Sequence, residues 1–330
     1  MIACGIESSA HTFGVGIVSD TNEKCNILAN EKSAYTTQFG GIHPREAMEH
    51  HLQNAQAVIE NALQKANVDW DEIDLISFSQ GPGLGPCLRV GAIAARALSL
   101  KYKKPLLGVN HCIAHIEIGK ALTQAKDPII VYVSGANTQI TGYESGRYRI
   151  YGETLDIGVG NLLDVFGRAL GIGFPAGPAL DKMYFESQNY IALPYTVKGM
   201  DLTFSGLLTA AENKAKSRQY VNADLAYSLL HTAFAMVTEV AERALAHTEK
   251  NEILLTGGVA ASRALQQMMQ EMCDARNAKM FVPPASVAVD NAAMIGWLGL
   301  IEHKAGIKQK LEDTKILPMQ RTDQVEVKWA

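Results

Sequence analysis

The sequence predicts an α/β protein made of two similar lobes that face one cleft. Buried-strand patterns alternate with helical patterns, which is typical of a partly parallel sheet covered on both faces. The order of strand, small polar turn and returning strand occurs twice, at residues 2–18 and 129–140. At 330 residues, the chain also exceeds the length over which a single core keeps growing. We therefore expect an N-terminal lobe at residues 1–125 and a C-terminal lobe at residues 126–330.

The first lobe is expected to hold a hairpin, two helices and two further strands. Its hairpin joins strands at residues 2–6 and 13–18 through a polar turn. Pro44 suits the first turn of a helix, where its missing amide would have no partner, and an apolar stripe continues that helix to residue 66. The later elements are a strand at 73–78, a loop at 80–86, an alanine-rich helix at 88–100 and a strand at 106–109.

The second lobe is expected to repeat this order around an insertion. Residues 171–222 carry Gly-Pro turns, and we interpret them as an insertion that shapes the cleft. The tail at residues 317–330 has no helical period and should lie extended on the surface or against a partner. The regular elements are a hairpin at 129–140, strands at 148–154, 252–256 and 279–282, and helices at 160–170, 225–250, 263–276 and 291–304.

Composition and charge favour a globular protein of the cytoplasm. The net charge of −4 and the pI of about 6.1 argue against a non-specific polyanion binder, so partner subunits would help to hold any nucleic acid. Five cysteines without a C-x-x-C spacing indicate a reducing compartment. No run of about 18 apolar residues and no signal-peptide pattern is present, so we expect no membrane contact and a cytoplasmic location.

Two histidines four residues apart form the strongest chemical signal. On a helix, His111 and His115 would leave the same face and could close on one metal ion, and Asn110 suits the helix start. An equally plausible interpretation packs one histidine in the core and exposes the other. A zinc peptidase is disfavoured, because that class needs a glutamate directly after the first histidine and Cys112 stands there.

An aspartate far along the chain is the candidate third ligand. Asp290 precedes an apolar helix, where it could simply cap the helix terminus. Alternatively, it supplies the carboxylate that the histidines lack. A set of two histidines and one aspartate with an open position suits iron or zinc better than magnesium. Only a fold that brings the two lobes face to face would assemble this set.

Small polar loops indicate an anion site. The turn at residues 7–12 and the turn containing Ser134, Gly135 and Ala136 each offer backbone amides, and the second lacks bulky side chains. The loop at residues 257–262 follows a strand and opens a helix, which adds a helix N-terminus. Three such loops in a duplicated fold favour a nucleotide site.

Seven segments together resemble one known family. The sequence is similar to the archaeal and eukaryotic branch of the TsaD family, the KEOPS-complex subunit for synthesis of N6-threonylcarbamoyladenosine in tRNA. The resemblance spans nearly the whole chain in order. The segments that carry it are residues 6–12, 80–86, 110–119, 133–138, 203–207, 256–261 and 290–295.

The resemblance implies a fold, an activity and partners. The fold would be that of actin, hexokinase and the heat-shock ATPases. The activity would transfer a threonylcarbamoyl group from its adenylate to N6 of the adenosine beside the anticodon, in tRNAs that read codons beginning with A. Implied partners are tRNA, a small protein kinase subunit and dimerising small subunits. ATP or threonylcarbamoyl-AMP would occupy the cleft, and the metal would be iron in the first place and zinc in the second.

Site residues also follow from the resemblance. Three positions depart from the family pattern, namely Ala136 for a glycine, Asp181 for a glutamate and Ser262 for an asparagine; Ala136 keeps its amide and should be tolerated if its backbone dihedrals are ordinary. The implied metal ligands are His111, His115 and Asp290, with Tyr132 as a further ligand. The implied nucleotide contacts are Tyr132, Val133, Ser134, Gly135, Ala136, Asp164, Gly177, Asp181 and Ser262.

Two other functions remain open. A phosphotransferase of the same fold, such as a sugar or acetate kinase, usually has aspartate where Glu7 stands and needs no histidine pair. A non-catalytic nucleotide-binding scaffold would need the glycine turns but not the histidines.

Overall fold

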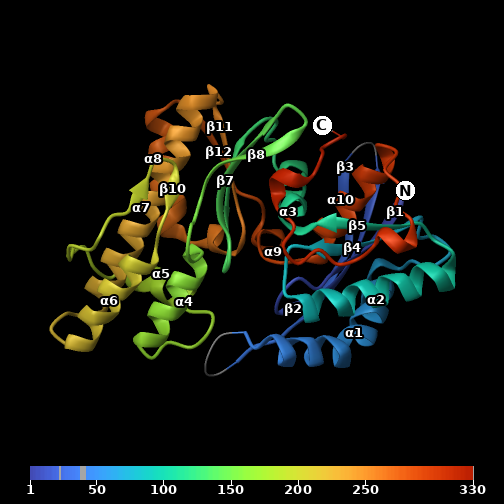
Figure 1. Ribbon diagram of the computed structural model, residues 1–330, viewed down its shortest axis with the longest axis horizontal. Helices are drawn as coiled ribbons and strands as arrows, with labels where there is room; N and C mark the ends of the chain where they lie inside the picture. Colours follow the sequence, from blue (N-terminus) through green and yellow to red (C-terminus); the bar gives the residue numbers. More distant parts are fainter. Residues whose placement is uncertain (22–23, 38–41, 330) are drawn as a thin grey trace.

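The computed structural model describes residues 1–21, 24–37 and 42–329, which form two five-stranded sheets, a small two-stranded sheet and the surrounding helices (Figure 1). The first sheet contains β1 (Ile2–Glu7), β2 (Thr12–Thr21), β3 (Lys24–Ala34), β4 (Leu75–Gly81) and β5 (Leu106–Asn110). The second contains β6 (Ile129–Val133), β7 (Thr138–Glu144), β8 (Arg147–Glu153), β11 (Glu252–Thr256) and β12 (Lys279–Phe281).

Both sheets have the same topology. The spatial order is β3-β2-β1-β4-β5 in one and β8-β7-β6-β11-β12 in the other. In each, the first three strands of the chain pair antiparallel, and the fourth and fifth join in parallel. The duplication predicted from the two hairpins is therefore confirmed.

The helices cover the sheets and fill the space between them. The chain carries α1 (Pro44–Ala66), α2 (Gly85–Tyr102), α3 (His111–Leu122), α4 (Val159–Ala169), α5 (Gly177–Tyr184), α6 (Ser205–Ser217), α7 (Asn222–Thr248), α8 (Arg263–Ala275), α9 (Ala285–Ala288) and α10 (Ala292–Lys304). Short 3-10 turns lie at η1 (Gly258–Ala261), η2 (Leu311–Asp313) and η3 (Thr322–Gln324). In Figure 1, α3 runs between the two sheets. No helix in the described ranges combines the length and the apolar character needed to cross a membrane.

The insertion and the tail take definite positions. The segment expected at residues 171–222 contains α5, α6 and the two-stranded pair β9 (Val197–Lys198) and β10 (Asp201–Leu202). Residues 317–329 of the tail lie against the chain's own lobes, with Thr322 and Val327 buried. The packing of the tail is therefore explained without the alternative in which it lies against a partner.

The last long helix, α10, packs on the first sheet although it belongs to the second half of the chain. A Cβ atom on Gly5 of β1 would lie 2.2 Å from the amide nitrogen of Gly296 and 2.4 Å from the carbonyl oxygen of Ala292. Ser77 of β4 donates a hydrogen bond of 2.9 Å to the carbonyl of Ile295. A helix from the second half of the chain thus packs on the first sheet, and the boundary near residue 125 stays a prediction.

Replacing Gly5 with alanine should destabilise the protein strongly. Because the added methyl meets backbone atoms, which cannot rotate away, we expect a loss on the order of 3 kcal/mol in the free energy of unfolding, measured by urea titration. The matched control is Gly206→Ala in α6, where no atom lies within 4 Å of the new Cβ, so helix propensity should make that variant equally or slightly more stable. Equal stability of Gly5→Ala and the wild type would contradict the close contact.

Candidate functional site

The histidine pair lies at the start of α3, as predicted. The Oδ1 atom of Asn110 accepts hydrogen bonds from the amides of Cys112 and Ile113, at 3.0 and 3.1 Å. This cap begins the helix at His111, so that His115 follows one turn later on the same face. Both imidazoles are buried, with ring centroids 4.9 Å apart. The alternative in which one histidine is exposed is therefore wrong.

Asp290 meets both histidines from the far end of the chain. Its Oδ1 atom lies 3.5 Å from Nε2 of His111 and 3.4 Å from Nε2 of His115. Asp290 does not cap α10. The next residue does, because Oδ1 of Asn291 accepts a hydrogen bond of 3.0 Å from the amide of Met294. The carboxylate of Asp290 is thereby free to face α3. The three candidate ligand atoms lie within 4.8 Å of one another.

The two separations between histidine and aspartate are those expected around a metal ion. Donor atoms around a tetrahedral zinc ion, with bonds of about 2.1 Å, are separated by about 3.4 Å. A charge-assisted hydrogen bond would be shorter, at about 2.8 Å. The separations of 3.4 and 3.5 Å match the first value. Imidazole and carboxylate donors together are also a set that zinc and iron accept.

Glu7, at the end of β1, orients the first histidine. Its Oε2 atom accepts a hydrogen bond of 3.0 Å from Nδ1 of His111, which directs Nε2 towards Asp290. Burial alone would lower the pKa of His111, but the facing carboxylates of Glu7 and Asp290 raise it well above its ordinary value. Burial likewise opposes ionisation of Asp290, yet its contacts with both imidazoles hold its pKa well below the usual range. The carboxylates of Glu7 and Asp290 therefore favour a positive charge at His111.

Glu7→Gln should weaken metal binding without removing a ligand. The amide keeps the length of the side chain but loses the charge that makes the imidazole of His111 a better donor. We expect a Zn²⁺ affinity about 10- to 100-fold lower, measured by competition with a chromogenic chelator. Glu60→Gln, at an exposed position of α1, is the control and should bind as the wild type does. An unchanged affinity for Glu7→Gln would show that the carboxylate has no such role.

Tyr132 stands beside the cluster on β6. Its ring centroid lies 5.2 Å from that of His115, and the side chain is 2% exposed. Burial raises the pKa of its hydroxyl well above the ordinary value, so the phenol is neutral unless a cation draws off its proton. Its roles as a metal ligand and a nucleotide contact stay predictions.

The turn after β6 presents open backbone amides. Gly135 and Ala136 are exposed, and their amides donate to no acceptor in the described part of the chain. The amides of Gly160 and Asn161, at the start of α4, bind the carbonyls of Ser134 and Gly135 at 3.1 and 3.0 Å and hold the turn from behind. Ala136 does not adopt a positive φ, which satisfies the condition for an alanine at this position. This arrangement can accept a phosphate, as an anion-binding turn does.

The third loop lies close to this turn. Gly257 has a φ of +96°, and a Cβ there would lie 2.2 Å from the carbonyl oxygen of Val133 at the end of β6. Ser262 caps α8, because its Oγ accepts the amide of Leu265 at 3.2 Å. The same hydroxyl donates to Asp181, whose carboxylate also accepts the amide of Ala264 at 3.1 Å. Ser262 and Asp181 are thus brought together at one helix terminus.

Asp164 and Gly177 also come together, beside α5. The amide of Ala176, directly before Gly177, donates to Oδ1 of Asp164 at 2.9 Å. Burial raises the pKa of Asp164, partly offset by this bond and by Arg168. That Asp164, Gly177, Asp181 and Ser262 contact a nucleotide stays a prediction.

One residue that shapes the cleft was missed by sequence reasoning. The carboxylate of Asp156 accepts the amides of Phe204 and Ser205, each at 2.9 Å, and so ties the start of α6 to the segment before α4. Burial alone would raise its pKa, but these amide donors lower it to about 2. The only signal in the sequence is an acidic residue in a loop, which by itself indicates nothing about a partner 48 residues away.

The two sheets of identical topology, each opening with an antiparallel hairpin, define the class of two-lobed proteins with a duplicated actin-like fold. Solved structures of that class align with it. HypF from Thermococcus kodakarensis has a TM-score of 0.61 at 16% identity, over 91% of this chain and 47% of that one. Component A of (R)-2-hydroxyglutaryl-CoA dehydratase from Acidaminococcus fermentans has a TM-score of 0.56 at 13% identity, over 91% and 97%. These likenesses confirm the predicted actin-like ATPase fold and nothing more specific.

The chain belongs to the TsaD family, tRNA N6-adenosine threonylcarbamoyltransferase, whose family model matches residues 26–297. A protein of that name from Thermococcus kodakarensis is 54% identical over the full length of both chains. Another, from Thermofilum pendens, is 48% identical over 98% of this chain and 96% of that one. A probable bifunctional tRNA threonylcarbamoyladenosine biosynthesis protein from Methanocaldococcus jannaschii is 51% identical, and this chain spans 60% of its length. The resemblance read from the motifs is confirmed, and the chain is a transferase of this family.

Proposed function

We propose that the chain transfers the threonylcarbamoyl group from threonylcarbamoyl-AMP to N6 of the adenosine beside the anticodon, in tRNAs that read ANN codons. In this proposal it is the metal-containing catalytic subunit of a KEOPS-type complex in the cytoplasm. Family membership supports the reaction class. The single observation that carries the catalytic role is the convergence of His111, His115 and Asp290 at metal-ligand spacing.

The proposed metal is held by these three side chains, with Tyr132 as a further ligand. Iron is the first expectation and zinc the second, because imidazole and carboxylate donors suit both. When bound, the metal would act as a Lewis acid and a template for the threonylcarbamoyl end of the substrate. Glu7 fixes the orientation of His111 through its bond of 3.0 Å.

The adenylate would lie along the loops of the second lobe. The free amides of Gly135 and Ala136 face the position of the phosphate and would stabilise the negative charge that AMP gains as it leaves. Gly177, Asp164, Asp181 and Ser262 would hold the nucleoside end, as the family resemblance implies. ATP would fit the same loops.

The tRNA must present its target base outside the stacked anticodon loop. An exocyclic amine inside a stacked loop cannot reach a buried site, so the base has to be splayed out. The net charge of −4 gives the chain little general attraction for RNA, which favours help from partner subunits. The small protein kinase and the dimerising small subunits are the proposed partners.

The test supplies the substrate directly. The metal-loaded chain, alone and with its partner subunits, is incubated with synthetic threonylcarbamoyl-AMP and an ANN-decoding tRNA transcript. The tRNA is then digested, and its nucleosides are identified by mass spectrometry. We expect threonylcarbamoyladenosine in the presence of partners, its loss on chelation, and its return when metal is added. Absence of the nucleoside from a metal-loaded complex would refute the proposed reaction.

The phosphotransferase alternative is less well supported by the geometry. Kinases of this fold usually have aspartate at the end of the first strand, whereas this chain has Glu7, which accepts bonds from His111 and from the amide of Ser9. Incubation with ATP and candidate sugars tests it, because a phosphorylated sugar that persists in His111→Ala would favour this alternative. A nucleotide-binding scaffold predicts instead that His115→Ala remains fully functional.

A further inference from the structure

We propose that residues 319–329, named here the C-terminal strap, position α3 and thereby set the geometry of its two histidines. The inference rests on the proposed metal site. The strap contacts the first lobe, the second lobe and α3 itself. It therefore links the metal-bearing helix to both sides of the cleft.

The chain leading into the strap is fixed to the first lobe. The amide of Gly108 on β5 donates to Gln309 at 2.7 Å, and Arg96 of α2 donates to Thr314 at 2.9 Å. Leu317 then donates its amide to the carbonyl of Gln80, at the end of β4, at 2.7 Å. These bonds fix the chain to the first lobe up to Leu317, two residues before the strap begins.

The strap itself crosses to the second lobe. Arg321 pairs with Glu153 at 2.9 Å, and Arg147 donates to the carbonyl of Asp323 at 3.2 Å. Further on, the amide of Val327 donates to the carbonyl of Gly146 at 2.8 Å. These bonds run along β8, so that a single segment joins the two sheets on one side of α3.

Two side chains of the strap bind α3 directly, one at each end of the histidine-bearing part. Gln320 Oε1 accepts a hydrogen bond of 3.2 Å from Nδ2 of Asn110, the cap residue. Trp329 Nε1 donates a bond of 3.0 Å to Oε1 of Glu117, two residues after His115. The helix is thus held at its first turn and again beyond the second histidine.

The bond from Gln320 pairs the donor end of the Asn110 amide. That side chain has an acceptor end and a donor end, and the helix uses the acceptor, since Oδ1 receives the amides of Cys112 and Ile113. With Gln320 in place, Nδ2 is paired as well, so bonds at both ends of the amide group hold the side chain. Without Gln320, only the two bonds at Oδ1 remain, which loosens the turn that begins with His111.

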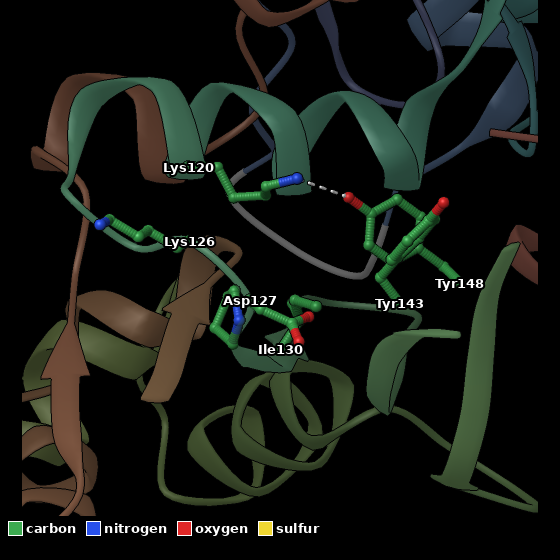
Figure 2. Close-up of a pocket in the computed structure, with 7 residues that line it drawn as sticks. Lys120, Lys126, Asp127, Ile130, Tyr143 and Tyr148 are labelled. Atoms are coloured by element: carbon green, nitrogen blue, oxygen red, sulfur yellow. Dashed lines mark hydrogen bonds between the residues drawn. The ribbon is translucent and has the colours of Figure 1, made fainter. Parts of the chain in front are cut away.

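The other contact ends in a buried polar network. The Glu117 carboxylate, 5% exposed, accepts from the Tyr148 hydroxyl and lies 3.4 Å from Nζ of Lys120. Lys120 donates a hydrogen bond of 3.2 Å to the Tyr148 hydroxyl, which the dashed line in Figure 2 marks. Both residues line a cavity of about 350 Å³. Glu117 of α3 thus accepts bonds from Trp329 of the strap and from Tyr148 of β8, and these bonds join the three segments.

The test separates positioning from mere stabilisation through matched variants of Gln320 in the full-length chain. Gln320→Met keeps the length but removes the acceptor, whereas Gln320→Glu keeps an acceptor. Glu326→Ala, an exposed strap position, is the control. Zn²⁺ affinity is measured by chelator competition, site geometry by the visible absorption of the Co²⁺-loaded chain, and stability by thermal unfolding.

We expect Gln320→Met to bind Zn²⁺ about tenfold more weakly and to alter the Co²⁺ spectrum, while Gln320→Glu and Glu326→Ala resemble the wild type. Wild-type affinity and an unchanged spectrum in Gln320→Met would overturn the inference. His115→Ala serves as the reference for the metal site. If it binds Zn²⁺ as tightly as the wild type, the metal site itself is wrong; if it alone loses binding, only the role of the strap is refuted.

Discussion

His115→Ala should abolish metal binding and tRNA modification while leaving the chain folded. The imidazole is a proposed direct ligand, and its Nε2 lies 3.4 Å from Oδ1 of Asp290. Loss of a direct ligand should exceed the effect of an outer partner, so we expect the affinity to fall by more than about 100-fold. Metal content by mass spectrometry and threonylcarbamoyladenosine by nucleoside analysis are the measurements.

Two features make this variant informative. Burial lowers the pKa of His115, so the substitution removes a side chain whose charged form is disfavoured. His247→Ala, at an exposed position near the end of α7, is the matched control and should keep both metal and activity. Full metal content in folded His115→Ala would rule out the proposed ligand set.

Glu302→Gln should stabilise the protein at alkaline pH and have little effect in acid. Glu302 lies on α10 with 6% exposure, and burial, reinforced by the nearby charge of Glu117, raises its pKa from 4.5 to about 8. Between these values, the folded chain retains a proton that the unfolded chain releases. The free energy of unfolding therefore falls as the pH rises through this window, and above about pH 8 the full cost of the buried charge remains.

Glutamine cannot ionise, so the variant avoids this cost. At pH 8 we expect Glu302→Gln to exceed the wild type by on the order of 4 kcal/mol in the free energy of unfolding, with the difference vanishing near pH 4. Urea titrations at several pH values measure it, and Glu271→Gln, at an exposed position of α8, is the control. A difference that does not depend on pH would mean that folding leaves the pKa of Glu302 unchanged, and it would contradict the proposed effect of burial.

Local features of the fold were predictable from the sequence because their causes lie within a few residues. Pro44 begins α1, Asn110 caps α3, and the two hairpins at the start of each sheet are real. Strand β3 was not predicted. Its burial alternates only weakly because it is an edge strand with many polar side chains, so its sequence carries no clear period, and only its pairing with β2 identifies it.

Contacts between distant residues were predictable only in part. The meeting of His115 with Asp290, 175 residues apart, was anticipated as one of two alternatives from the types of residue, and the family resemblance implied it as well. The bond between Glu7 and His111, across 104 residues, was not anticipated, because a glutamate in a polar turn has many possible partners. Nor does an irregular tail reveal that Gln320 and Trp329 bind α3. Such contacts depend on where the fold places each side chain.

The packing of α10 on the first sheet has a consequence for biosynthesis. Ala3, Val18 and Leu75 share one core with Ile295 and Leu298 of this helix. The ribosome synthesises the N-terminal sheet long before α10. One apolar face of that sheet therefore stays exposed to solvent until translation is almost finished. A nascent chain that stops before residue 292 cannot bury this face. It therefore depends on chaperones or aggregates.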